Sequence, residues 1–185
     1  MNTRECVFRI LDEIREILEM VDQEQCDRFI DALIEADRVF IAGAGRTRRI
    51  MEAFAIRLVH LGFGVYVVGE AVTPAIRDKD LLVIGSGSGE TSTLKAIKAK
   101  AGSAECSIAT LTINGDSHLA QDTDYLIVIP GAANHLEDQT QHTWQPGANS
   151  FEQSLMILLD AIVIMIANRM NIDIFKKLDL HANLE

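Results

Sequence analysis

The sequence predicts an α/β fold, namely a doubly wound, five-stranded parallel sheet of order 2-1-3-4-5 (flavodoxin-like) with an N-terminal pair of helices. Five short apolar segments lack the polar alternation of half-exposed strands, as in parallel sheets that are covered on both faces. Segments with helical spacing separate most of them, which is typical of doubly wound folds. Without repeats or a linker, the chain is predicted to be a single domain over residues 1–185, with residues 1–36 as helices packed on the sheet domain.

The individual elements follow from the spacing of apolar residues. Residues 3–21 place apolar side chains three and four positions apart, which predicts a first helix, and a second runs from about Gln23 to Ala36. Helices are also predicted over residues 46–61, over 91–101, and from Asn149 to about Met170. The last is apolar nearly all round, so we expect it to be buried on most sides. The strands are predicted in "RVFIAGAG", "GVYVVGE", "DLLVIGSG", "CSIATLTI" and "DYLIVIPG".

Composition excludes several classes of protein. The chain has 185 residues, 48% hydrophobic residues and a formal net charge of −10, which argues against disorder and against nucleic acid as a partner. Its three cysteines form no metal-binding spacing. The longest apolar run, residues 155–167, contains Asp160 and falls short of the roughly 20 residues that span a bilayer. We expect a soluble cytoplasmic protein that binds neither membrane nor metal.

Two glycine loops end the first and third predicted strands. They are "GAGRT", residues 43–47, and "GSGSGET", residues 85–91. In the order 2-1-3-4-5 these strands are neighbours, so both loops open on the crevice where such folds bind ligands. Glycines and helix starts offer N–H groups to an anion, and serines and threonines add hydroxyls. Neither loop has a lysine, which excludes the Walker nucleotide loop and favours a small phosphate monoester. The alternative is that Ser88 or Thr91 merely caps the following helix.

Glu152 and His181 are candidates for chemistry. Glu152 lies in the first turn of the last predicted helix, either as a general base or as the partner of Asn149 in a capping box. His181, near the C-terminus, is either simply exposed or reaches into a site.

A family resemblance rests on "FIAGAGRT", "RLVHLGF", "VVGEAVTP", "LLVIGSGSGET", "SFEQ" and "HANLE". The sequence is similar to the sugar isomerase (SIS) domain family, and within it to the 6-phospho-3-hexuloisomerases. The resemblance implies an isomerase that interconverts D-arabino-3-hexulose 6-phosphate and fructose 6-phosphate by enediol-type proton transfer. That reaction belongs to the ribulose monophosphate pathway of formaldehyde assimilation. It also implies no cofactor, and a homodimer or homotetramer with its sites near subunit contacts.

The same resemblance implies roles for individual residues. Glu152 matches the proton-transferring glutamate, and His181 matches a terminal histidine that assists ring opening or protonates an oxygen, in its own subunit or a neighbour's. The alternatives are another phosphosugar isomerase or a non-catalytic phosphosugar-binding module of the SIS type. The substrate-binding residues implied are Thr47, Ser86, Gly87, Ser88, Gly89, Glu90 and Thr91.

Two residues depart from the family pattern, and one segment matches none. Thr47 stands where serine is usual and keeps the hydroxyl, whereas Arg48 stands where a small residue is common. This cation would either add a phosphate contact or narrow access to the loop. The polar segment 131–147 is expected to be a lid or an intersubunit loop.

Overall fold

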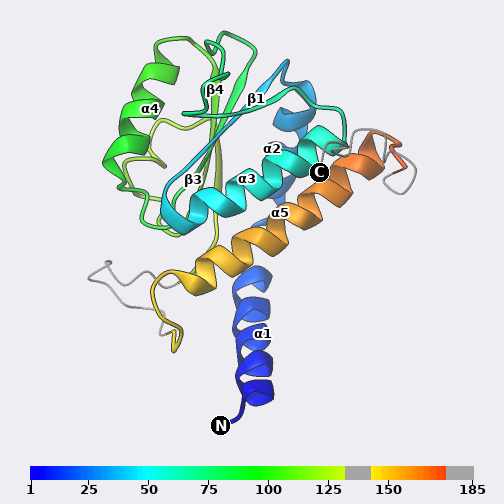
Figure 1. Cartoon of the computed structure of the whole chain (residues 1–185), viewed down its shortest axis with the longest axis vertical. Coiled ribbons are helices and arrows are strands. Elements are labelled where there is room, and N and C mark those ends of the chain that lie inside the picture. The colour runs from blue at the N-terminus through cyan, green and yellow to red at the C-terminus, as the bar shows by residue number, and fades with distance from the viewer. Residues whose placement is uncertain (132–142, 174–185) are drawn as a thin grey trace.

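The computed structural model describes residues 1–131 and 143–173, and it contains a five-stranded parallel sheet (Figure 1). The strand order is β2-β1-β3-β4-β5, and every neighbouring pair is parallel, so the predicted fold class is confirmed. The edge strand β2 is shorter than its predicted segment. The strands are β1 (Val39–Gly43), β2 (Val65–Val67), β3 (Leu81–Gly85), β4 (Ser107–Thr112) and β5 (Tyr125–Val128).

Helices cover both faces of this sheet (Figure 1). One face packs against α2, α3 and α5 in a core that includes Phe29, Met51 and Phe151. The other face packs against α4, with Leu94 from the helix and Ile84 from the sheet. Each face thus has its own apolar core, which explains why β1 and β3 read as continuous apolar runs. The helices are α1 (Thr3–Glu19), α2 (Gln23–Glu35), α3 (Gly45–His60), α4 (Ser92–Gly102) and α5 (Asn149–Arg169).

Parts of α1 and α5 leave apolar side chains in contact with solvent. The first turns of α1 extend away from the sheet, whereas its last turns pack beside α5 (Figure 1). The prediction that α5 is buried on most sides is wrong for the described part of the chain, because several of its apolar side chains there are exposed. By length and composition α5 could cross a membrane, and half of its most apolar window is buried within the fold. The exposed apolar residues on these two helices include Val7, Phe8, Leu11, Met156, Ile157, Ile164 and Met165.

The register of the central strands brings the two glycine loops together. Residue Gly43, the last of β1, lies opposite Gly85, the last of β3. Helix α3 starts directly after β1, and the loop that leads to α4 starts directly after β3. The two loops therefore open side by side at the carboxyl edge of the sheet, as predicted.

Candidate functional site

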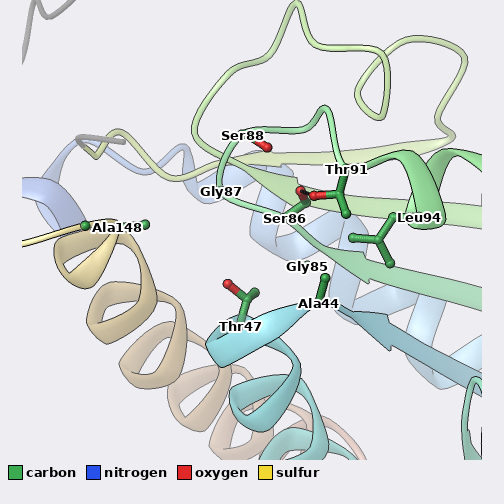
Figure 2. A pocket seen from close by; sticks show the side chains of 10 residues that line it. Ala44, Thr47, Gly85, Ser86, Gly87, Ser88, Thr91, Leu94 and Ala148 are labelled. Atoms are coloured by element: carbon green, nitrogen blue, oxygen red, sulfur yellow. Dashed lines mark hydrogen bonds between the residues drawn. The ribbon is translucent and has the colours of Figure 1, made fainter. Parts of the chain in front are cut away.

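A pocket of about 220 Å³ lies at this carboxyl edge. Figure 2 shows that Thr47 of α3 lies across the pocket from the loop that follows β3. The start of α5 closes a third side. The lining residues are Ala44, Thr47, Gly85, Ser86, Gly87, Ser88, Thr91, Leu94, Gly147 and Ala148.

Three helices begin at the wall of this pocket. Ala44, Thr91 and Ala148 are the N-cap residues of α3, α4 and α5, and all three line it. None of the three side chains accepts a hydrogen bond from its helix. The N–H groups of a first helical turn have no partner within the helix and carry partial positive charge. The pocket therefore offers an anion site made of backbone, without lysine.

The hydroxyls of the loop after β3 bond within the loop itself. The Ser86 Oγ accepts a hydrogen bond from Gly89 N at 3.2 Å and lies 3.5 Å from the Thr91 Oγ1. The Ser88 Oγ accepts from Glu90 N at 3.2 Å. Neither Ser88 nor Thr91 caps α4 with its side chain. Thr91 therefore occupies the N-cap position of α4 through its backbone alone, and neither hydroxyl acts as a side-chain cap.

Close packing of α3 on β3 brings Thr47 to the pocket. A Cβ atom on Gly85 would lie 2.6 Å from Met51 Sδ and 3.3 Å from Thr47 Cγ2. Only a glycine at the end of β3 leaves room for the first turn of α3 at this distance. Thr47 is buried and faces the loop after β3 across the pocket (Figure 2). This loop, residues 85–91 with Ser86, Ser88 and Thr91, is called the hydroxyl loop below.

The Glu152 carboxylate lies behind Thr47, one hydrogen bond from the pocket. Its Oε1 accepts from Thr47 Oγ1 at 3.3 Å, and its Oε2 lies 3.2 Å from Arg46 Nε. Glu152 is 7% exposed. The capping-box interpretation is wrong, because Ala148 rather than Asn149 is the N-cap, and the Asn149 side chain accepts from Arg46.

Glu90 belongs to the same loop but turns its carboxylate away from the pocket. It accepts from the backbone N of His118 at 2.9 Å, and its other oxygen lies 2.7 Å from His118 Nδ1 and 3.3 Å from Lys95 Nζ. These hydrogen bonds, the backbone one foremost, lower the pKa of Glu90 to about 2. Its carboxylate ties the hydroxyl loop to the segment that follows β4.

The structure brings most of the predicted site residues together. Five of the seven expected substrate contacts line the pocket, while Gly89 and Glu90 support the loop from outside it. His181 and most of the segment 131–147 lie outside the described residues. Within residues 1–131 and 143–173, no three His, Cys, Asp or Glu side chains are grouped to hold a metal.

Sequence reasoning missed two parts of the site. The first is the start of α5 at Gly147 and Ala148, which carries no side chain that would mark it as a binding residue. The second is Arg46, whose contact with Glu152 spans more than one hundred residues. The position of Arg46 could have indicated this contact, because a cation in the first turn of a helix is unfavourable beside the helix dipole unless a carboxylate pairs with it.

The chain belongs to the SIS domain family, whose model matches residues 32–165. The resemblance seen in the sequence is thereby confirmed. This chain is 37% identical over 185 residues to the 3-hexulose-6-phosphate isomerase of Bacillus subtilis (strain 168), and the match covers all of both chains. It is 36% identical over 177 residues to the enzyme of that name from Mycobacterium gastri, covering 95% of this chain and 88% of that one.

A solved structure with the same fold is that of a Methanococcus jannaschii protein for which a function of 3-hexulose-6-phosphate isomerase was inferred. The two chains superpose with a TM-score of 0.84 at 30% identity, covering 98% of this chain and 99% of the other.

Proposed function

We propose that this protein is a 3-hexulose-6-phosphate isomerase, which interconverts D-arabino-3-hexulose 6-phosphate and fructose 6-phosphate. The observation that carries the proposal is a lysine-free anion pocket, built from three helix starts, beside a buried carboxylate. Full-length similarity to the Bacillus subtilis enzyme of that name supports the choice of substrate. The reaction would carry formaldehyde assimilation forward in the ribulose monophosphate pathway.

The phosphate of the substrate is expected to bind in this pocket. The N–H groups at the starts of α3, α4 and α5 would surround it, and the hydroxyls of Ser86, Ser88 and Thr91 would donate to its oxygens. The Ser86 and Ser88 oxygens can keep accepting from Gly89 N and Glu90 N, because donation to the phosphate uses their O–H groups. Such binding fixes one end of the sugar and leaves the other to reach Thr47 and Glu152.

The chemistry requires one proton to move between adjacent carbons. A base removes the proton from C2 of the 3-ketose while the C3 carbonyl oxygen gains a proton, which gives a 2,3-enediol. Returning a proton to C3 and removing one from the C2 hydroxyl yields the 2-ketose. Glu152 is the proposed base and then acid, because its carboxylate lies one hydrogen bond from the pocket and can hold the proton between the two steps. The proposed oxygen-protonating role of His181 stays a prediction.

Proton exchange in fructose 6-phosphate tests this proposal. In D₂O the enzyme should replace the C3 hydrogen with deuterium and leave the C1 hydrogens in place, because its enediol spans C2 and C3. Glu152→Gln should lower the exchange rate by roughly 10²–10⁴-fold. Asp160→Asn, the other carboxylate on α5, is the matched control and should exchange at the normal rate. Exchange at C1 would indicate a different isomerase, and no exchange with retained binding would indicate a sugar-phosphate sensor.

We also propose that the chain assembles as a homodimer or homotetramer, as a soluble protein of the cytoplasm. Leu11 of α1 and Ile157 of α5 line a groove between the two helices, and Phe8 is exposed about one turn before Leu11 on α1. Burial of such a face stabilises an assembly by about 25 cal/mol for each Å² of apolar area. Phe8→Asp should shift the sedimentation coefficient toward that of the monomer, whereas an unchanged value would contradict assembly through this face.

Contacts of α1 support the expected nearness of site and interface. The guanidinium carbon of Arg9 lies 4.6 Å from the centre of the Trp144 ring. Gln145 Nε2 donates to Glu13 Oε2 at 3.1 Å. Helix α1 therefore holds the segment that leads directly to Gly147 in the pocket wall.

A further inference from the structure

Arg46 stands in the first turn of α3, where a cation is electrostatically unfavourable. The N-terminal end of a helix carries partial positive charge, and a cation there costs roughly 0.3–1 kcal/mol at an exposed position. Arg49 in the same turn pairs with Glu52 of its own helix. Arg46 instead pairs with Glu152 of α5. Arg46 is therefore paired with a carboxylate of another helix, whereas Arg49 is paired within its own helix.

The guanidinium of Arg46 joins two residues one turn apart on α5. Its Nε lies 3.2 Å from Glu152 Oε2, and its Nη1 donates to Asn149 Oδ1. On the other side of the carboxylate, Thr47 Oγ1 donates to Oε1 at 3.3 Å. Each carboxylate oxygen thus has one partner from α3, which is the Thr47 hydroxyl for Oε1 and the Arg46 guanidinium, as an ion pair, for Oε2. Since a carboxylate has about four acceptor sites, these two contacts hold the group in one orientation and leave other sites free.

This geometry separates Arg46 from the anion pocket. Thr47 and Ala148 line the pocket, but Arg46 does not. Its side chain is 56% exposed, whereas that of Glu152 is 10% exposed. A change at Arg46 therefore leaves the core intact, and its main consequence is a buried carboxylate that has lost its ion-pair partner and rotates more freely.

We propose that Arg46 is a positioning residue, which holds the Glu152 carboxylate in the orientation that aims it at the carbon that loses its proton. The inference rests on the proposed function, because it takes Glu152 to be the base. It predicts that Arg46 acts on turnover through Glu152 and leaves phosphate binding unchanged. If Arg46 bound phosphate directly, its loss would weaken phosphate binding. If it only joined α3 to α5, its loss would lower the stability of the fold and leave turnover unchanged.

The test compares Arg46→Gln with Arg49→Gln, a matched control from the same turn of α3. For C3 exchange in fructose 6-phosphate, Arg46→Gln should lower kcat by about 10- to 100-fold, as misplacement of a catalytic group by about 1 Å does. The KM and the inhibition constant of inorganic phosphate should change by less than about threefold, since the pocket keeps its own donors. Arg46→Lys should recover part of kcat, and Arg49→Gln should match the wild type.

A second measurement asks whether the two residues act as one unit. In the Glu152→Gln background, adding Arg46→Gln should cause no further loss of the residual exchange rate, because residues that act as a unit are non-additive. A full additional loss would overturn the proposal. So would a tenfold rise in the phosphate inhibition constant, or an unchanged kcat with a lower melting temperature.

The same assay separates this inference from the proposed function. A wild-type protein without C3 exchange, or a normally active Glu152→Gln variant, overturns the proposed mechanism and the role of Arg46 with it. An active wild type, an inactive Glu152→Gln variant and an Arg46→Gln variant equal to its Arg49 control overturn the role of Arg46 alone.

Discussion

The variant Gly89→Ala tests whether the hydroxyl loop owes its shape to crowding as well as to backbone conformation. Gly89 has φ of +67°, and an added Cβ would lie 2.0 Å from Ser117 Oγ and 2.3 Å from Ser117 Cβ. The left-handed conformation costs an alanine about 1–2 kcal/mol. Forcing a methyl group into packed surroundings costs about 1–3 kcal/mol more. We therefore expect the free energy of unfolding to fall by about 2–5 kcal/mol, to be measured by urea denaturation.

Two other glycines separate these contributions. Gly45 has φ of +58° with no atom within 4 Å of an added Cβ, so Gly45→Ala should lose only the conformational cost of about 1–2 kcal/mol. Gly102 has open space and no positive φ, so Gly102→Ala should keep its stability or gain up to about 1 kcal/mol. In the Gly89→Ala protein, adding Ser117→Gly should recover part of the loss. The crowding argument is refuted if Gly89→Ala is no less stable than Gly45→Ala.

Three further predictions concern charge, packing and thiol chemistry. Because hydrogen bonds lower the pKa of Glu90 from 4.5 to about 2, its carboxylate stabilises the fold fully above about pH 4.5 and loses this effect as the pH falls toward 2. Glu90→Gln should therefore flatten the pH dependence of the melting temperature in that window, and an unchanged slope would contradict the assignment. Phe151 is fully buried beneath Gly87, so Phe151→Ala should cost about 3–5 kcal/mol in urea denaturation and weaken phosphate binding. Burial raises the pKa of the Cys26 thiol to about 11, so a disulfide reagent at about pH 8 should modify Cys26 only after unfolding, and rapid native modification would contradict its burial.

The fold class was predictable because burial on both faces is visible in the sequence. Strands β1 and β3 have apolar side chains on both faces of the sheet, so their segments show no alternation. The glycine loops were predictable for a related reason, since a tight turn between strand and helix limits the choice of residue. The length of β2 was not predictable from its own residues, because β2 is an edge strand and its length depends on how far it pairs with β1.

The surroundings of Glu152 show where sequence reasoning reaches its limit. The local pattern from Asn149 to Glu152 resembles a capping box, and that interpretation uses only contacts within one helix. In the fold, both side chains contact Arg46, and the glutamate also contacts Thr47. Contacts between residues so distant in sequence depend on how α3 and α5 pack, which no local pattern records.

The construction of the anion pocket from helix starts has a consequence for how its ligand arrives. The chain carries a net charge of −10, and the arginines at the start of α3 are paired with carboxylates. Backbone partial charges act only within about one helical turn, so an approaching phosphate ester meets a repulsive field before it meets the pocket. Salt screens that field over about 10 Å at 0.1 M ionic strength. Added salt should therefore speed association, the opposite of its effect on enzymes that attract their substrates from a distance.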